Sequence, residues 1–169
     1  TANIKKEVGK CTYTHMLNSD GGIETDLTVV CIAENHFRII SSAATRERDK
    51  FHIRKYLSKE IELIDITDDY CVFGLFGPKS RQLIKTISRD NFDNDDFKFG
   101  TAKYISIDGV KIWTQRLSYV GELGYELYVK FKDAKKIYDL LIDKGKNFNL
   151  SNCGMHAMDI MRMESGFLH

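Results

Sequence analysis

The sequence predicts an α+β chain in which helices pack on mostly antiparallel sheets. Short β-rich runs are joined in pairs by turn residues, helical patterns follow these pairs, and single strands do not alternate strictly with helices. The strongest hairpin signal is Asp108-Gly109 between Lys103–Ile107 and Val110–Gln115, and Glu34-Asn35 joins a second hairpin. These observations favour hairpin-containing units over a parallel sheet.

The first part of the chain is expected to contain one sheet and one helix. Ser42 can cap the helix because its hydroxyl can accept a backbone N–H. The spacing of apolar residues predicts that Phe51, Tyr56 and Leu57 face inward. In chain order we expect a strand over 10–17, a glycine turn over 19–22, strands over 27–33 and 36–40, the helix over 42–59, and a strand over 61–66.

A second unit is expected to start near Tyr70. Cys71–Phe76 is a nearly continuous apolar run, which predicts a strand buried on both faces. Gly77-Pro78 then opens a helix that carries Leu83, Ile84 and Ile87, because proline is favoured in a first turn. The remaining expected elements are an acidic loop over 90–96, the 103–115 hairpin, a strand over 124–131, and a final helix. Asp133 is expected to cap this helix, which runs through Leu141, and Gly145 is expected to end it.

Composition excludes several classes of function. The 169 residues are 43% hydrophobic and 29% charged, as in soluble globular proteins that bury a substantial core. Lys and Arg number 25 against 24 Asp and Glu, so the basic excess typical of nucleic-acid binding is missing. No apolar run approaches the roughly 20 residues that span a bilayer. We therefore expect a small-molecule partner, with no nucleic acid and no membrane.

The cysteines and histidines give no sign of a metal site. The four cysteines form no C-x-x-C pair, and the histidines lack metal-ligand spacing. Widely separated thiols fit a reduced setting, in which cysteine is a small core residue. We expect no metal and a cytoplasmic location, or the mitochondrial matrix if the source is eukaryotic.

Three segments carry residues suited to chemistry. In the first, Tyr13 lies on the expected strand over 10–17, and the glycine turn through Gly21-Gly22 then leads to Glu24 and Asp26. Paired glycines let a backbone approach a ligand closely, and a carboxylate beyond them can act as an acid or base, or stabilise a cationic intermediate. The structural alternative is a strand, turn and strand with solvated acids.

In the second segment, two glycines bracket Glu122 on an expected turn, between Tyr119 and Tyr125. The carboxylate can accept two parallel hydrogen bonds from an N–C–N edge such as that of a pterin or guanine. The tyrosine rings can offer flat faces for stacking. The structural alternative is a polar turn with Tyr125 in the core and Glu126 in solvent.

The third segment, Cys153–Gly166, has helical spacing and four methionines, which are more often core residues than a binding surface. His156 is more often structural than a ligand. Arg162 needs an anionic partner, and it can pair with Glu164 or Asp159 or receive an anionic ligand.

Together, and in the same order, these segments resemble the folate-binding family of glycine-cleavage T-proteins. The family carries the patterns M-L-N-x-x-G-G-x-x-D-D-L, G-Y-T-G-E-x-G-[YF]-E and R-L-E-x-G. Here they correspond to Met16–Leu27, Ser118–Glu126 and Arg162–Gly166. Within the family, the sequence resembles most the folate domains of dimethylglycine and sarcosine dehydrogenases, through 21–29, 118–128 and 154–158.

This resemblance implies a partial T-protein-like folate-binding fold. Its first β/α portion would be 1–68 and its second, ferredoxin-like α+β portion 69–169. The chain begins without methionine and stops inside an apparent element, so we expect both portions to be truncated at the chain ends. The implied cofactor is tetrahydrofolate, with FAD in a further N-terminal domain of the same longer chain.

The resemblance also implies a reaction. The flavin domain would oxidise an N-methyl amine to an iminium, and this chain would capture the iminium or formaldehyde unit as 5,10-methylenetetrahydrofolate. The alternatives are a stand-alone aminomethyltransferase of the glycine cleavage system, a folate-dependent demethylase, or a non-catalytic folate-binding regulatory protein.

Carried over by position, Glu122 resembles the glutamate that holds the pterin, and Tyr13 resembles a tyrosine that lines the folate pocket. Arg162 matches the arginine of the last motif, and Tyr119 and Tyr125 are expected to shape the pocket.

The acidic pair departs from the family pattern. The family aspartate credited with steering the transfer is replaced by Thr25, whereas Asp26 matches the second aspartate. Asp26 and Glu24 are therefore the candidate catalytic acids, although a one-residue shift on a strand reverses the face of a side chain. Met158 stands where T-proteins usually have arginine, which again resembles the dehydrogenase branch.

Overall fold

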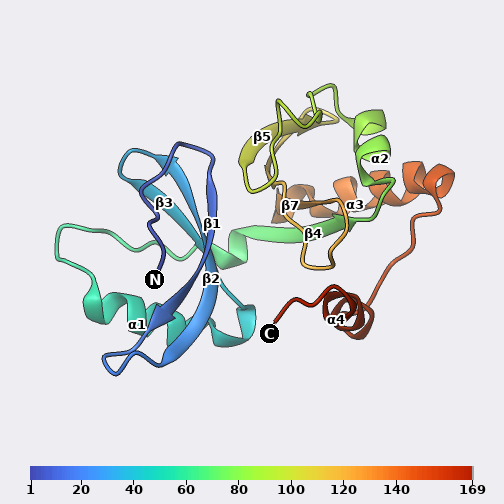
Figure 1. The fold of residues 1–169 in the computed structure, drawn as a ribbon. Helices are drawn as coiled ribbons and strands as arrows, with labels where there is room; N and C mark the ends of the chain where they lie inside the picture. Colours follow the sequence, from blue (N-terminus) through green and yellow to red (C-terminus); the bar gives the residue numbers. More distant parts are fainter. Residues whose placement is uncertain (169) are drawn as a thin grey trace. The chain divides into compact units, whose positions relative to one another are not determined.

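A computed structural model describes residues 1–168 and divides the chain into two compact units. The first unit is Thr1–Ile66, and the second begins at Thr67. Each unit combines an antiparallel sheet with helices (Figure 1). The predicted α+β class with antiparallel sheets is therefore confirmed.

The first unit is built on a three-stranded antiparallel sheet in the order β1-β2-β3. In β1, Thr12 and Thr14 are buried whereas Tyr13 between them is exposed, as expected for a strand with one covered face. The predicted strand, glycine turn and hairpin are confirmed, although β2 starts earlier than predicted. The elements are β1 (Cys11–Leu17), β2 (Ile23–Ala33), β3 (His36–Ile40), the 3₁₀ turn η1 (Ala43–Thr45) and α1 (Arg46–Tyr56).

The predicted inward face of α1 is wrong. Phe51 and Tyr56 are 73% and 58% exposed, and the buried residue of the helix is Asp49. Ser42 does cap a helical turn, but this turn is η1, where its hydroxyl accepts the Ala44 N–H. The charged residues of this helix outnumber the apolar ones, so apolar spacing was a poor guide to its orientation.

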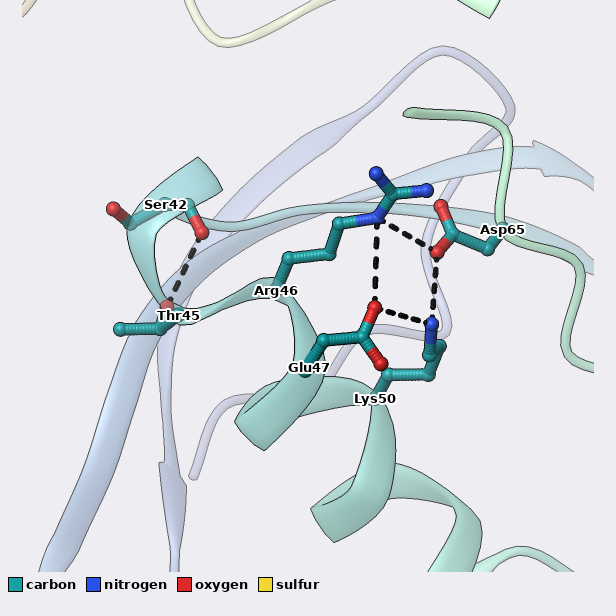
Figure 2. A network of polar contacts seen from close by, with 6 residues as sticks. All are labelled: Ser42, Thr45, Arg46, Glu47, Lys50 and Asp65. Carbon is teal, nitrogen blue, oxygen red and sulfur yellow. Dashed lines mark hydrogen bonds and ion pairs between the residues drawn. The ribbon is translucent and has the colours of Figure 1, made fainter. Parts of the chain in front are cut away.

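The predicted strand over 61–66 is also wrong, because this segment forms no sheet. Ion pairs hold it to α1 instead (Figure 2). Asp65 Oδ2 lies 2.9 Å from Arg46 Nε and 3.3 Å from Lys50 Nζ, and Lys50 also pairs with Glu47 at 2.6 Å. Apolar alternation alone does not make a strand where no neighbouring strand is available to pair with it.

The second unit is a four-stranded antiparallel sheet in the order β4-β7-β6-β5, with α2 and α3 packed on β7 and on each other (Figure 1). The 103–115 hairpin is confirmed, and Asp108 and Gly109 both have positive φ, as a tight hairpin turn requires. The elements are the 3₁₀ turn η2 (Thr67–Asp69), β4 (Tyr70–Phe76), α2 (Ser80–Ile87), β5 (Ala102–Ile107), β6 (Val110–Gln115), β7 (Gly124–Lys130), α3 (Phe131–Gly145), η3 (Lys146–Phe148) and α4 (Met155–Glu164).

The core of this unit lies between the helices and one face of the sheet. Leu83 and Ile84 of α2 are buried as predicted, and they pack with Ile137 of α3. The aromatic rings of Phe92 and Phe97 join the same cluster from the 90–101 loop. This side of the sheet is therefore fully used for packing.

Two further predictions for the second unit are wrong. β4 is an edge strand with Val72 53% exposed, so it is not buried on both faces. Asp133 lies in the first turn of α3 without capping it. α3 does end at Gly145, as predicted, although this glycine keeps negative φ. Its small size makes room for Leu150, since a Cβ at Gly145 would lie 2.4 Å from Leu150 Cδ2.

The described part of the second unit also differs from a ferredoxin-like motif. That motif has the order β-α-β-β-α-β. Here the order is β-α-β-β-β-α, followed by α4, and every strand pairing is antiparallel.

Candidate functional site

Two of the predicted site residues meet on the accessible face of the first sheet. The Tyr13 hydroxyl donates a hydrogen bond to Asp26 Oδ2 at 3.1 Å, across β1 and β2. His15 is the direct cross-strand partner of Asp26, and its ring contacts that of Tyr13 edge to face, with centroids 5.5 Å apart. The sheet thus presents an accessible carboxylate flanked by a phenol and an imidazole, groups that can hold or move a proton.

Thr25 and Asp26 point to opposite sides of this sheet. Thr25 is only 7% exposed, like the neighbouring Thr14, whereas Asp26 is exposed. The position where the family aspartate is replaced therefore faces the covered side. An acid remains available on the accessible side.

Glu24 is not placed by simple strand alternation. The pairing of β1 with β2 shifts between Met16 and Leu17, so that Glu24 is an extra residue in a β-bulge. Its backbone carbonyl accepts a hydrogen bond from Arg48 Nη2 of α1 at 2.6 Å. The side chain is half-buried and makes no hydrogen bond to the Asp26 side chain, so the structure does not bring the two candidate acids together as a pair.

The second predicted segment forms a loop between β6 and β7 that is tied at several points. Arg116 begins it by donating to the Asn94 side chain at 2.8 Å and to the Phe97 carbonyl. At its other end, the Leu123 carbonyl accepts the Gly77 N–H at 2.8 Å. The loop therefore has a defined conformation.

Glu122 lies at the exposed tip of this loop and makes no hydrogen bond or ion pair with residues 1–168. Gly121 precedes it with φ +74°, and a Cβ there would lie 2.1 Å from Ser165 Oγ. The Ser165 hydroxyl donates to the Val120 carbonyl at 3.1 Å. The second and third motifs are thus in contact, and both the positive φ and the close approach of Ser165, the C-cap of α4, favour glycine at position 121.

Tyr125 does not shape a pocket, contrary to the prediction. It is 0% exposed, and its ring packs against Phe92 and Phe97 with centroids 5.6 and 5.8 Å away. Its hydroxyl accepts a hydrogen bond from Arg81 Nε at 3.3 Å. Both ring faces lie within the core, so the structural alternative holds for this residue.

Glu126 is the functional candidate that sequence reasoning missed, because it was considered only as a solvent-exposed residue in the structural alternative. Its side chain lies on the sheet face opposite Tyr125, where it is largely withdrawn from water. Burial raises the pKa of this carboxyl, and a hydrogen bond from the Tyr128 hydroxyl at 2.8 Å opposes the rise only in part. No cation pairs with Glu126 among the described residues.

The surroundings of Glu126 combine an amide with aromatic rings. Gln115 is its direct cross-strand partner on β6 and is fully buried. Trp113 is the partner of Tyr128 on the same face, and Tyr104 contacts the Trp113 ring with centroids 5.0 Å apart. A carboxylate beside flat apolar rings is suited to a planar ligand that carries hydrogen-bond donors on one edge.

The third segment forms α4, and here Arg162 has an internal partner. Arg162 Nε donates to Asp159 Oδ1 at 2.7 Å, and Nη1 donates to the Phe167 carbonyl at 3.0 Å. Its side chain is only 13% exposed. Of the alternatives left open, pairing with Asp159 is the one observed, so the guanidinium is already used within the chain.

The methionines of α4 are not core residues in the described chain, because none of the residues of this helix is buried. Tyr119 lies beside the helix, where a hollow of about 220 Å³ is lined by Tyr119, Met155, His156, Met158 and Asp159. This volume is below the roughly 300 Å³ at which ligand pockets begin. Alone, the hollow is too small for a folate.

Residues 1–168 hold no group of three or more His, Cys, Asp or Glu side chains arranged to bind a metal. Among these residues, every helix also falls short of the length and apolar character needed to cross a bilayer.

The sequence matches the GCVT N-terminal domain family over residues 1–169. The chain therefore belongs to this family, as the three motifs indicated. It is a domain of the type shared by aminomethyltransferases and by dimethylglycine and sarcosine dehydrogenases.

Three relatives show how widely this domain occurs among enzymes. The chain is 32% identical to 4-methylaminobutanoate oxidase (formaldehyde-forming) of Paenarthrobacter nicotinovorans over 100% of its length. It is 30% identical to human mitochondrial dimethylglycine dehydrogenase and 31% identical to an aminomethyltransferase of Halothermothrix orenii, each over 98% of its length. It spans only 21%, 20% and 45% of these three proteins, respectively.

Solved structures share the fold. The glycine cleavage aminomethyltransferase T of Bartonella henselae superposes with a TM-score of 0.81 at 21% identity, covering 96% of this chain and 42% of that one. The heterotetrameric sarcosine oxidase of Corynebacterium sp. U-96 superposes with a TM-score of 0.65 at 14% identity, covering 88% of this chain and 69% of that one. The predicted T-protein-like fold is confirmed.

Proposed function

We propose that this chain is the tetrahydrofolate-binding, one-carbon transfer module of an FAD-dependent enzyme of the dimethylglycine and sarcosine dehydrogenase type. Membership of the GCVT family and the dehydrogenase relatives support this class. The single observation that carries the proposal to a ligand is the desolvated carboxyl of Glu126, which lies among aromatic side chains and has no cationic partner within residues 1–168.

A pterin fits the chemistry around Glu126. Its amino-substituted N–C–N edge offers two parallel N–H donors, which match the two oxygens of a carboxylate. Such donors would favour the ionised form and offset the cost of its burial. In this proposal Glu126 takes the role that sequence reasoning gave to Glu122, and Glu122, exposed at the tip of the loop, does not hold the pterin.

Asp26 is the acid proposed to act on the one-carbon unit. An iminium is cationic, and an accessible carboxylate can stabilise it and accept a proton during the transfer. Bound tetrahydrofolate would supply the two nitrogens that accept the carbon. Overall, two C–N bonds to folate form, the carbon–nitrogen double bond to the donor amine breaks, and the two folate N–H protons end on the departing amine. Tyr13 holds the Asp26 carboxylate by its hydrogen bond.

The proposal is tested on the full-length protein with sarcosine and with dimethylglycine, in the presence and absence of tetrahydrofolate. We expect 5,10-methylenetetrahydrofolate to replace free formaldehyde as product when folate is present. Glu126→Gln should raise the KM for tetrahydrofolate, and Asp26→Asn should lower kcat. Identical products with and without folate would contradict the proposal.

The aminomethyltransferase relative supports a second candidate, a stand-alone aminomethyltransferase. This candidate predicts folate-dependent release of ammonia from an aminomethyl group carried by a partner protein, without a flavin. A flavin absorbance spectrum of the full-length protein separates the two candidates, because only the first contains FAD.

A further inference from the structure

The β-bulge in β2 decides which side chain lies beside Tyr13. Near the turn, Leu17 pairs with Ile23, whereas farther along the strands His15 pairs with Asp26. Between these two pairs β1 advances by two residues, whereas β2 advances by three. One extra residue, Glu24, absorbs this difference.

The bulge therefore reverses the faces of the sheet on which Thr25 and Asp26 would otherwise lie. Without the extra residue, the register at the turn would continue along the strand and place Thr25 opposite His15. Asp26 would then lie opposite Thr14, on the buried side. A shift of one residue reverses every face of a strand, so the bulge is the reason that an acid, and not Thr25, lies beside Tyr13.

Arg48 supplies a hydrogen bond at the bulge. The extra residue of a bulge is left out of the regular ladder, so its backbone groups need other partners. Arg48 Nη2 donates to the Glu24 carbonyl at 2.6 Å, and it reaches this carbonyl from α1. This contact lies two residues from Asp26.

The Arg48 guanidinium is in turn held by a buried carboxylate. Asp49 is 3% exposed, and its Oδ1 lies 3.5 Å from Arg48 Nε. The Thr45 hydroxyl donates to the other oxygen, Oδ2, at 2.6 Å. A buried carboxylate requires such partners, because an uncompensated charge in the interior is strongly unfavourable. Asp49 thus fixes the direction from which Arg48 approaches the bulge.

We propose that Arg48 is a positioning residue for Asp26, holding the bulged register that places this carboxylate beside Tyr13. The inference rests on the proposed function, in which Asp26 acts on the one-carbon unit. Arg48 is more than 50% exposed in its side chain and binds a backbone carbonyl, so its role is to hold the strand and not to contact the folate.

The test compares Arg48→Met, which removes the hydrogen-bond donors, with Arg48→Lys, which keeps a charged donor group. In the full-length protein, Arg48→Met should lower kcat for 5,10-methylenetetrahydrofolate formation by about ten- to hundredfold, the order of loss expected from a small misplacement of a reacting group. The KM for tetrahydrofolate should stay within about twofold. Arg48→Lys should recover part of the rate.

Arg46→Met is the matched control, because Arg46 lies on the same helix and pairs with Asp65 (Figure 2). It should lower the Tm without changing kcat. An equal loss of kcat in both methionine variants, or no loss in Arg48→Met, would overturn the inference.

A second readout does not depend on activity. Cross-strand nuclear Overhauser contacts between Met16 and Thr25 report the bulged register. They should weaken in Arg48→Met and persist in Arg46→Met, and unchanged contacts in Arg48→Met would overturn the inference. If the wild-type protein shows these contacts but no folate-dependent product, the proposed function fails while the role of Arg48 in the register stands.

Discussion

The hydroxyl of Tyr13 and Oδ2 of Asp26 lie 3.1 Å apart, which joins two strands of the first sheet on its accessible face. A hydrogen bond to a charged group is worth about 1.5–3 kcal/mol, so its loss should affect the reactive carboxylate. We expect Tyr13→Phe to lower kcat about tenfold. Tyr56→Phe, at an exposed tyrosine on α1, is the control and should leave kcat unchanged; equal rates in both variants would contradict the role of Tyr13.

Glu126 should make stability depend on pH. Its pKa is raised by burial above the ordinary value of 4.5, so the folded state binds a proton more tightly than the unfolded state. The free energy of unfolding therefore falls as pH rises from 4.5 through the raised pKa, and it stays lower above it. Glu126→Gln should raise the Tm at pH 7 and leave it unchanged below about pH 4.

Thermal unfolding of both proteins across this pH range checks the prediction for Glu126. Glu164→Gln, at an exposed carboxylate of α4, serves as the control and should show no such pH-dependent difference. A lower Tm for Glu126→Gln at pH 7 would show that the ionised carboxylate stabilises the fold, contrary to this account.

Gly121→Ala should destabilise the protein more than Gly100→Ala. Both glycines have positive φ, which costs an L residue about 1–2 kcal/mol. Only at Gly121 would the added Cβ overlap a neighbour, Ser165 Oγ at 2.1 Å, whereas the space at Gly100 is open. Overpacking adds about 1–3 kcal/mol, measurable by urea unfolding. Equal losses would mean that α4 does not pack on this loop.

Arg162→Met should leave the affinity for tetrahydrofolate within about twofold, because its guanidinium is bound to Asp159 and to the Phe167 carbonyl. The variant should instead lower stability. A double-mutant cycle with Asp159→Asn should give a coupling of about 0.5–1 kcal/mol, as for partly exposed pairs. A tenfold loss of affinity would restore Arg162 as a ligand residue.

Much of the fold could be predicted from local sequence signals. The Asp108-Gly109 turn and the apolar positions of α2 specify their elements without distant contacts. The segment over 61–66 and the orientation of α1 could not be predicted in this way. They depend on ion pairs between α1 and Asp65, which are distant in sequence.

The site was predicted less completely, because its geometry depends on the sheet. Tyr13 and Asp26 could be proposed from their motifs, but the bulge at Glu24 is invisible to simple alternation. Tyr125 and Glu126 lie on opposite faces of the sheet because side chains alternate along β7, but the sequence does not show that Tyr125 enters the core or that Glu126 is withdrawn from water. In the motif, Glu122 lies between two glycines of a turn and is easily noticed as a candidate, whereas Glu126 lies inside a strand and is not.

Calorimetric titration of the full-length protein with tetrahydrofolate tests the central claim most directly. We expect binding by the wild type, and a loss of affinity of about ten- to hundredfold in Glu126→Gln, as follows from losing hydrogen bonds to a charged group. Glu122→Gln is the matched control, and its affinity should stay within about threefold of the wild type. No binding by the wild type, or a loss confined to Glu122→Gln, would contradict the account.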